Sequence, residues 1–143
     1  MNPLILAAAA GIVLSSLSSV AGAACAAPSV RVNTRVAMIP LLTGNTVCVP
    51  AVTRPTMEAQ ELHRADGALI DFKRGPTHPV DPSKQVGTWA VTGTDGRGIF
   101  VTHRYSGGQA YTYAVWRNVD GTHSFCSANP EVKARIKTGG GAC

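Results

Sequence analysis

The sequence predicts a small all-β protein, an antiparallel meander of about eight short strands that forms a barrel or a sandwich. Fifteen glycines and nine prolines divide the chain into short pieces. Several pieces alternate apolar with polar residues or are rich in β-branched residues, which is typical of strands. The chain also has four cysteines, and small exported domains often use disulfides to compensate for a modest core.

The N-terminal segment predicts export. An apolar, alanine-rich run over 4–14 leads into the small residues 21–24, which fit the A-x-A cleavage pattern of a signal peptide. We expect a signal peptide over 1–23 and a single β domain over 24–143. The run is too short for a transmembrane span, so a soluble periplasmic or secreted bacterial protein is expected. A lipid anchor on Cys25 is the less favoured alternative, because Gly22 stands where lipidation signals usually have leucine.

Two short strands are expected first. Residues 29–33 alternate apolar with polar side chains, and 46–49 form a β-branched run that Pro50 stops. Between them, Pro40 and Gly44 interrupt any regular pattern. No helix is predicted in this part of the chain.

A hairpin is expected next. Residues 58–64 and 68–73 flank Ala65-Asp66-Gly67, a three-residue connection with glycine at the position that needs a left-handed backbone. The alternative is a helix over 57–65, whose residues are good helix formers. The tight reversal at Asp66-Gly67 favours the hairpin.

The second half predicts one long loop and then five strands. The loop covers 75–85 and contains three prolines. Glycine-containing turns separate the first four of the following strands. The expected strands are 86–91, 98–105, 110–118, 122–127 and 132–137.

The four cysteines predict two structural disulfides. Three pairings are available, and we expect Cys25–Cys48 and Cys126–Cys143, which would staple the N-terminal arm and the last strand to near neighbours. Each bridge would close a loop of about 20 residues and contribute on the order of 3 kcal/mol. A redox or zinc site needs closer spacing, as in C-x-x-C.

The charge of the chain suits an anionic partner. The net charge is +5, and the part from Arg97 onward carries six basic and two acidic residues. A well-solvated surface is the favoured explanation of this excess, and an acidic protein face or an envelope component is the kind of partner that the charge would suit. Nucleic acid is not expected, because the chain has no Lys/Arg-rich block.

Three residues are the candidate contacts with such a partner. Arg104, Tyr105 and Tyr111 flank the turn 106–109, and arginine and tyrosine are frequent interface anchors. A cross-strand aromatic ladder is the alternative explanation of the tyrosines. These residues favour a non-enzymatic binding or inhibitor-like envelope protein.

Two other functions stay open. A small hydrolase could use Glu61 and His63, which share one face of the expected strand, although cross-strand charge pairing explains them equally well. A lipocalin-like carrier of a small apolar ligand is the second, because Gly87-Thr88-Trp89 resembles the G-x-W signature of lipocalin barrels. No metal or cofactor is expected, since the four histidines lack metal-ligand spacing.

Three motifs resemble a known group of proteins. Leu41-Leu-Thr-Gly-Asn-Thr46, Gly87-Thr88-Trp89 and the final Gly141-Ala142-Cys143 are similar to those of short exported proteobacterial proteins grouped in a domain-of-unknown-function family. The resemblance covers about residues 41–143. It implies a periplasmic β domain of unassigned activity and brings no catalytic residues.

Overall fold

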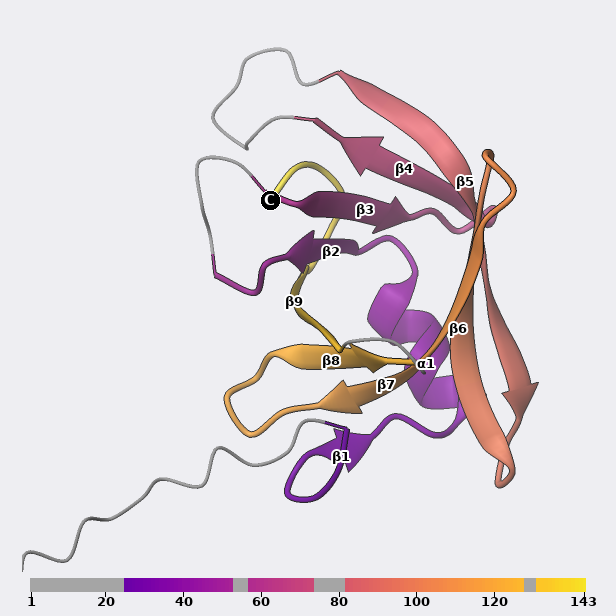
Figure 1. Ribbon diagram of the computed structural model, residues 1–143, viewed down its shortest axis with the longest axis vertical. Coiled ribbons are helices and arrows are strands. Elements are labelled where there is room, and N and C mark those ends of the chain that lie inside the picture. The colour runs from indigo at the N-terminus through magenta and orange to yellow at the C-terminus, as the bar shows by residue number, and fades with distance from the viewer. Residues whose placement is uncertain (1–24, 53–56, 74–81, 128–130) are drawn as a thin grey trace, which may run out of the picture.

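The computed structural model describes residues 25–52, 57–73, 82–127 and 131–143, which build a closed antiparallel barrel of eight strands with one extra strand and one helix (Figure 1). The elements are β1 (Val30–Arg31), α1 (Arg35–Leu42), β2 (Thr46–Val49), β3 (Ala59–His63), β4 (Ala68–Phe72), β5 (Ser83–Thr94), β6 (Gly98–Tyr105), β7 (Ala110–Arg117), β8 (His123–Cys126) and β9 (Val132–Lys137).

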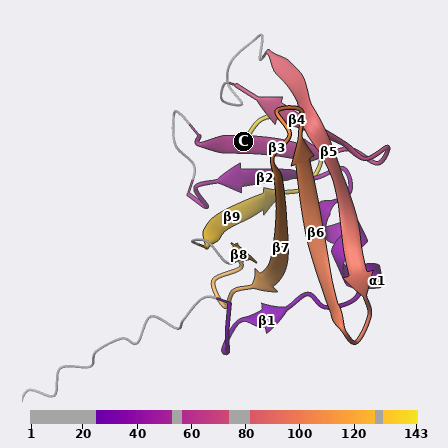
Figure 2. The same ribbon diagram turned by 45° about the vertical axis from the view of Figure 1, so that its right-hand side comes forward.

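The barrel is a simple meander. Each strand from β2 to β9 pairs with its neighbours in the chain, and β9 pairs with β2 to close the ring. The first half of β7 pairs with β6, and β1 pairs with the last two residues of β7 (Figure 2). The predicted antiparallel meander of about eight short strands is therefore confirmed, and it forms a barrel.

The predicted hairpin is confirmed. β3 and β4 are joined by a turn in which Gly67 has φ +86°, and the Arg64 carbonyl accepts a hydrogen bond from the Gly67 amide (3.0 Å). Asp66 stabilises the turn, because its carboxylate accepts a hydrogen bond from the Ala68 amide (3.1 Å). The helix considered as the alternative for this region does not form.

The predicted loop over 75–85 ends earlier than expected. β5 begins at Ser83, so residues 83–85 belong to a strand, where Gln85 pairs with Ile70 and Lys84 with Asp71. Residues 74–81 lie outside the described residues. The strands predicted over 98–105 and 132–137 have the observed bounds of β6 and β9.

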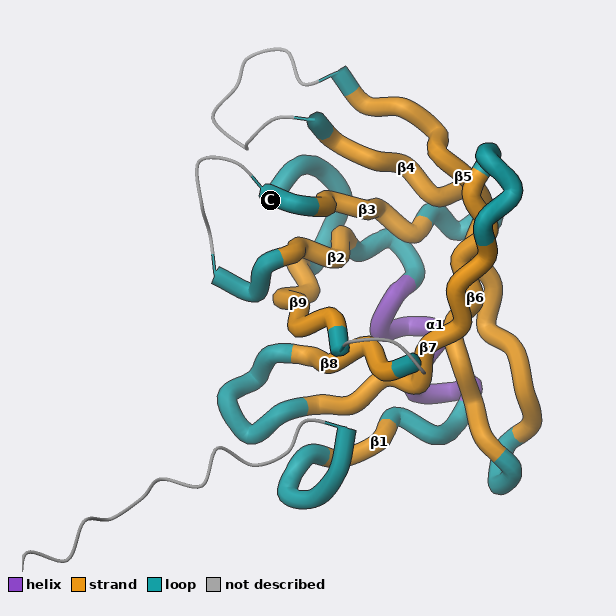
Figure 3. Tube along the Cα trace, viewed as in Figure 1, coloured by secondary structure: helices purple, strands orange, loops and turns teal. Residues whose placement is uncertain are grey.

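Helix α1 was not predicted, because Pro40 lies within it. The burial of Met38 and Leu42, one helical turn apart and both fully buried, accounts for the helix. Asn45 satisfies the helix end by donating its side-chain amide to the Leu41 carbonyl (2.9 Å). The helix packs against β5 and β6 (Figure 3). It adds two large side chains, those of Met38 and Leu42, to the core.

The core lies inside the barrel and against the helix. Inward-facing side chains alternate along the strands, as in β6, where Ile99, Val101 and His103 are buried. The core cluster consists of Val32, Met38, Leu42, Val47, Leu69, Trp89, Ile99, Val101, Val115, Phe125 and Ala134.

Two disulfides form, but the predicted pairing is wrong. Cys48 pairs with Cys143 and Cys25 with Cys126, with Cα atoms 5.9 and 6.1 Å apart. The expected Cys25–Cys48 and Cys126–Cys143 bridges assumed that cysteines near in sequence are near in space.

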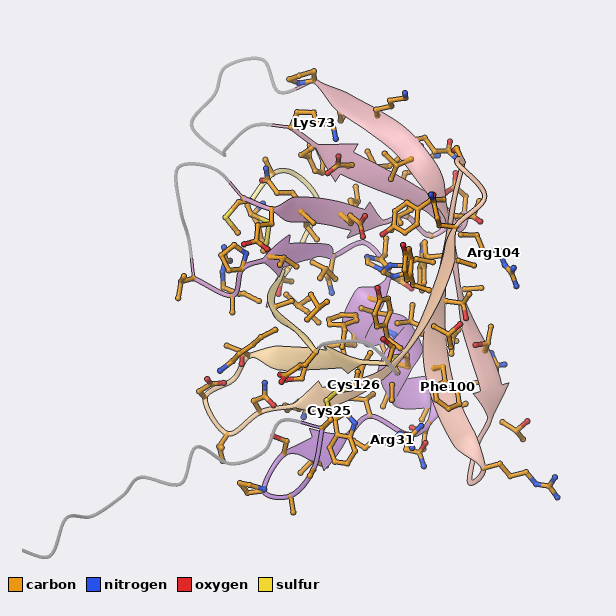
Figure 4. The ribbon with its side chains drawn as sticks, viewed as in Figure 1. Cys25, Arg31, Lys73, Phe100, Arg104 and Cys126 are labelled. Atoms are coloured by element: carbon orange, nitrogen blue, oxygen red, sulfur yellow. A yellow bond between two sulfur atoms is a disulfide. The ribbon has the colours of Figure 1, made fainter. Side chains whose placement is uncertain are left out.

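The closure of the barrel explains the observed pairs. β9 lies between β8 and β2, and the segment after it turns back over the outer face of β2, where Thr46 Oγ1 donates to the Gly141 carbonyl (2.8 Å). Cys48 shares that face with Thr46 and therefore meets Cys143. The N-terminal arm instead runs beside β7 through β1, so Cys25 meets Cys126 at the end of β8 (Figure 4).

The predicted signal peptide over 1–23 and its cleavage site lie outside the described residues. Within the described part of the chain, no helix is long and apolar enough to cross a membrane.

Candidate ligand-binding site

A cavity of about 240 Å³ lies inside the barrel. Most of its wall is apolar, and two carboxylates, those of Glu58 and Glu61, are among its polar groups. The side chains come from β2, β3 and β6 to β9, with Glu58 just before β3. The lining residues are Val47, Val49, Glu58, Ala59, Glu61, His103, Tyr105, Tyr113, Phe125 and Val132.

Strand alternation places the polar groups. Glu61 and His63 are two residues apart on the inner face of β3, and His103 and Tyr105 are two apart on the inner face of β6. These two strands are not neighbours in the sheet, so the barrel brings their side chains together across its interior.

The polar side chains form a chain of contacts. The Tyr105 hydroxyl donates to Glu61 Oε1 (2.7 Å), and Glu61 Oε2 lies 3.6 Å from His103 Nδ1. His103 Nε2 lies 2.9 Å from His63 Nε2, and His63 Nδ1 lies 3.1 Å from the backbone carbonyl of Glu61.

Both histidines are neutral at neutral pH. Burial, reinforced by the neighbouring His103, lowers the pKa of His63 to about 3, and burial lowers the pKa of His103 to about 4. Glu61 and His103 are therefore not an ion pair. Burial raises the pKa of the Glu61 carboxyl against the opposing effect of the Tyr105 hydrogen bond. Burial and the nearby carboxyl of Glu61 also raise the pKa of Tyr105.

Aromatic rings continue from the histidines along the cavity. The rings of His103 and Tyr113 have centroids 5.7 Å apart, and those of Tyr113 and Phe125 are 6.0 Å apart. On the other side, His63 contacts Trp89 edge-on at 5.0 Å. The polar cluster is thus held by packed rings with little freedom to rotate.

The three predicted contact residues do not share one surface. Tyr105 faces the interior and lines the cavity, while Tyr111, 46% exposed, packs against its ring at 5.9 Å. This contact is the aromatic ladder considered as an alternative. Arg104 is exposed on the opposite face of β6 and points away from the barrel (Figure 4). Adjacent residues of a strand alternate in direction, which separates Arg104 from Tyr105.

The predicted Glu61–His63 pair is brought together only through a third residue. Both side chains share one face of the strand as expected, and that face is the inner one, but His63 contacts His103 and the Glu61 backbone. His103 was missed, although the period-2 pattern Ile99, Val101, His103 marks it as an inward residue of β6. The proximity of His103 to β3 could not be predicted from the sequence of either strand alone.

In the described residues, no group of three or more His, Cys, Asp or Glu side chains could hold a metal ion. The fold and site together define a small closed β-barrel with a mostly apolar cavity and a partly buried carboxylate, that of Glu61. In comparisons with known proteins, no family model, curated protein or solved structure matches this chain. The resemblance to a family of exported proteins therefore stays a prediction.

Proposed function

We propose that this protein is an exported, non-enzymatic binding protein that holds a small, mostly apolar molecule in the cavity of its barrel. The observation that carries the proposal is the cavity of about 240 Å³, which has a mostly apolar wall and is lined in part by valine, alanine and phenylalanine. An apolar cavity of about 150 Å³ in another protein takes up benzene. Ligand sites typically combine such walls with a few placed polar groups.

The state of His63 favours binding over hydrolysis. A general base must reach its substrate and accept a proton near the working pH. His63 has no exposed surface, and both of its ring nitrogens are engaged, one with His103 and one with the Glu61 carbonyl. Its pKa of about 3 makes it a poor proton acceptor at neutral pH.

The cavity is also favoured over docking through the outer surface. Arg104 and Tyr105 lie on opposite faces of β6, so the three expected contacts cannot meet one flat partner together. Binding to an anionic protein or envelope component stays a prediction.

The two disulfides support export of the protein. All four cysteines are paired, and disulfides persist in oxidising compartments such as the periplasm or the extracellular space. The alternative of a lipid anchor on Cys25 requires a free thiol, whereas Cys25 is bonded to Cys126.

Propylbenzene is a suitable first probe, because it is neutral and apolar. We expect saturable shifts of the methyl NMR signals of Val47, Val49 and Val132 when it is added. The substitution Ala59→Phe fills the cavity from β3 and should abolish these shifts; Val132→Phe serves the same purpose from β9.

Ala110→Phe is the matched control, since it adds the same side chain at an exposed position on β7. It should leave propylbenzene binding unchanged. The proposal fails if the wild-type protein shows no saturable shifts, or if a folded cavity-filling variant binds propylbenzene as well as the Ala110→Phe control.

A further inference from the structure

The hydrogen positions in the polar cluster follow from one backbone carbonyl. The carbonyl of Glu61 can only accept a hydrogen bond, so His63 Nδ1 carries the hydrogen of that ring. His63 is neutral, so its Nε2 accepts. His103 Nε2, at 2.9 Å, must then donate, which leaves His103 Nδ1 without a hydrogen.

Two acceptors therefore face each other in the cavity wall. Glu61 Oε2 and His103 Nδ1 are 3.6 Å apart, beyond ordinary hydrogen-bond distance, and neither supplies a hydrogen to the other when Glu61 is ionised. Glu61 Oε1 already accepts from Tyr105. The cluster thus presents two acceptor atoms, Oε2 and Nδ1, close enough together for one hydrogen-bond donor to contact both.

The charges around these two atoms favour a cationic donor. Glu58 and Glu61 both line the cavity, and its lining includes no lysine or arginine. Asp71, opposite Glu61 in the β3–β4 pair, adds negative charge, although its contact with Lys73 offsets part of it. Burial raises the pKa of Glu61, as expected for a carboxylate whose charge has no buried cation beside it.

The walls suit the rest of such a ligand. Tyr105 and Tyr113 present aromatic rings beside the carboxylate, and ring faces attract ammonium groups. Valine and phenylalanine side chains line the remainder, where an apolar body would lie.

We infer that the ligand is a small primary amine with an apolar body, whose ammonium group donates hydrogen bonds to Glu61 Oε2 and His103 Nδ1. This inference rests on the proposed cavity binding and names its ligand class. No covalent step is involved.

Four probes of similar size separate charge from shape. These are 2-phenylethylamine, 2-phenylethanol, propylbenzene and phenylacetate, which present an ammonium, a hydroxyl, a methyl and a carboxylate group. At pH 7.5, we expect 2-phenylethylamine to bind at least about tenfold more tightly than the two neutral probes, and phenylacetate to bind most weakly, because a buried carboxylate repels a second one. Affinities are measured by NMR titration of the wild-type protein.

The substitution Glu61→Gln tests the assigned group. Glutamine still accepts from Tyr105 but has no charge, so the preference for the amine over propylbenzene, with both affinities measured on the same variant, should fall at least about tenfold. Asp120→Asn is the matched control, because it removes one carboxylate from an exposed turn. It should leave the preference for the amine intact.

The outcomes distinguish the two proposals. If all four probes bind with similar affinity, or if Glu61→Gln keeps the preference for the amine, the inference is overturned and the proposed cavity binding stands. If no probe binds the wild-type protein, both are overturned. The wild-type ranking of the probes decides the question even if Glu61→Gln does not fold.

Discussion

His63 Nε2 and His103 Nε2 lie 2.9 Å apart in the interior of the barrel, so a single hydrogen is shared between two buried imidazole rings. A second hydrogen between these two nitrogens would place two N–H groups against each other, which opposes protonation of His63 at Nε2. Burial opposes protonation of both rings, and the folded protein therefore keeps them neutral.

Acid should destabilise the protein through these two histidines. Both have folded-state pKa values, about 3 and about 4, below the ordinary value of 6.5. The unfolded chain therefore binds more protons than the folded one between pH 6.5 and 3. The contribution of these histidines to the free energy of unfolding is fully present above pH 6.5. It is lost as the pH falls, by up to about 1.4 kcal/mol per pH unit for each histidine.

Urea unfolding at pH 7.5, 6 and 5 measures this effect. The variant His103→Gln should show a shallower decline, because one of the two groups is removed. Glu61 acts with the opposite sign, since its raised pKa lets the folded state take up a proton more readily as pH falls. A free energy of unfolding that is constant between pH 7.5 and 5 would contradict the prediction.

Each disulfide should make a large contribution to stability. Cys48–Cys143 and Cys25–Cys126 join residues 95 and 101 positions apart, and the chain-entropy model assigns loops of about 100 residues a contribution near 4.7 kcal/mol. The double substitution Cys48→Ala with Cys143→Ala should lower the free energy of unfolding by about 2–5 kcal/mol.

Peptide mapping without reduction checks the pairing directly. It should recover one peptide pair containing Cys25 and Cys126 and another containing Cys48 and Cys143. Recovery of a Cys126–Cys143 pair from the folded protein would refute the observed arrangement.

Gly87 should tolerate no side chain. A Cβ atom there would lie 2.1 Å from the carbonyl oxygen of Arg104, so β5 and β6 would have to move apart. We expect Gly87→Ala to destabilise the protein by about 3 kcal/mol, at the upper end of overpacking effects. Thermal and urea unfolding measure the change.

Gly140→Ala is the control for that variant. Its Cβ would meet only Leu62 Cδ2 at 3.5 Å, an ordinary contact, and the expected change is within about 0.5 kcal/mol. Equal free energies of unfolding for the two variants would show that the close approach of β5 and β6 at Gly87 does not exclude a side chain there.

The parts of the fold that depend on local signals were predictable. Asp66-Gly67 determines a turn by itself, the glycine-containing turns on either side of 98–105 predicted the bounds of β6, and the alternation in 132–137 predicted those of β9. Helix α1 was not predictable in this way. Pro40 disfavours a helix locally, and only the burial of Met38 and Leu42 in the finished core outweighs it.

The site was less predictable than the fold. Sequence spacing identified Glu61 and His63 as a pair on one face, but the residue that connects them, His103, is 40 positions from His63. The predicted disulfide pairing was wrong for the same reason, since the pairing of β9 with β2 decides which cysteines meet. Contacts across a closed barrel depend on how the whole ring of strands is assembled, and no local pattern records them.

The two disulfides also determine how the protein would respond to a pulling force. Between Cys25 and Cys143, three covalent paths run in parallel, through the segments 25–48, 48–126 and 126–143, because each segment runs from one bridge to the other. The strands from β3 to β7 lie in the longest of the three, 48–126. Tension applied at Cys25 and Cys143 would therefore draw the shortest segment, 126–143, taut first, and that segment would limit how far the strands with the buried histidine pair and Glu61 can be pulled apart.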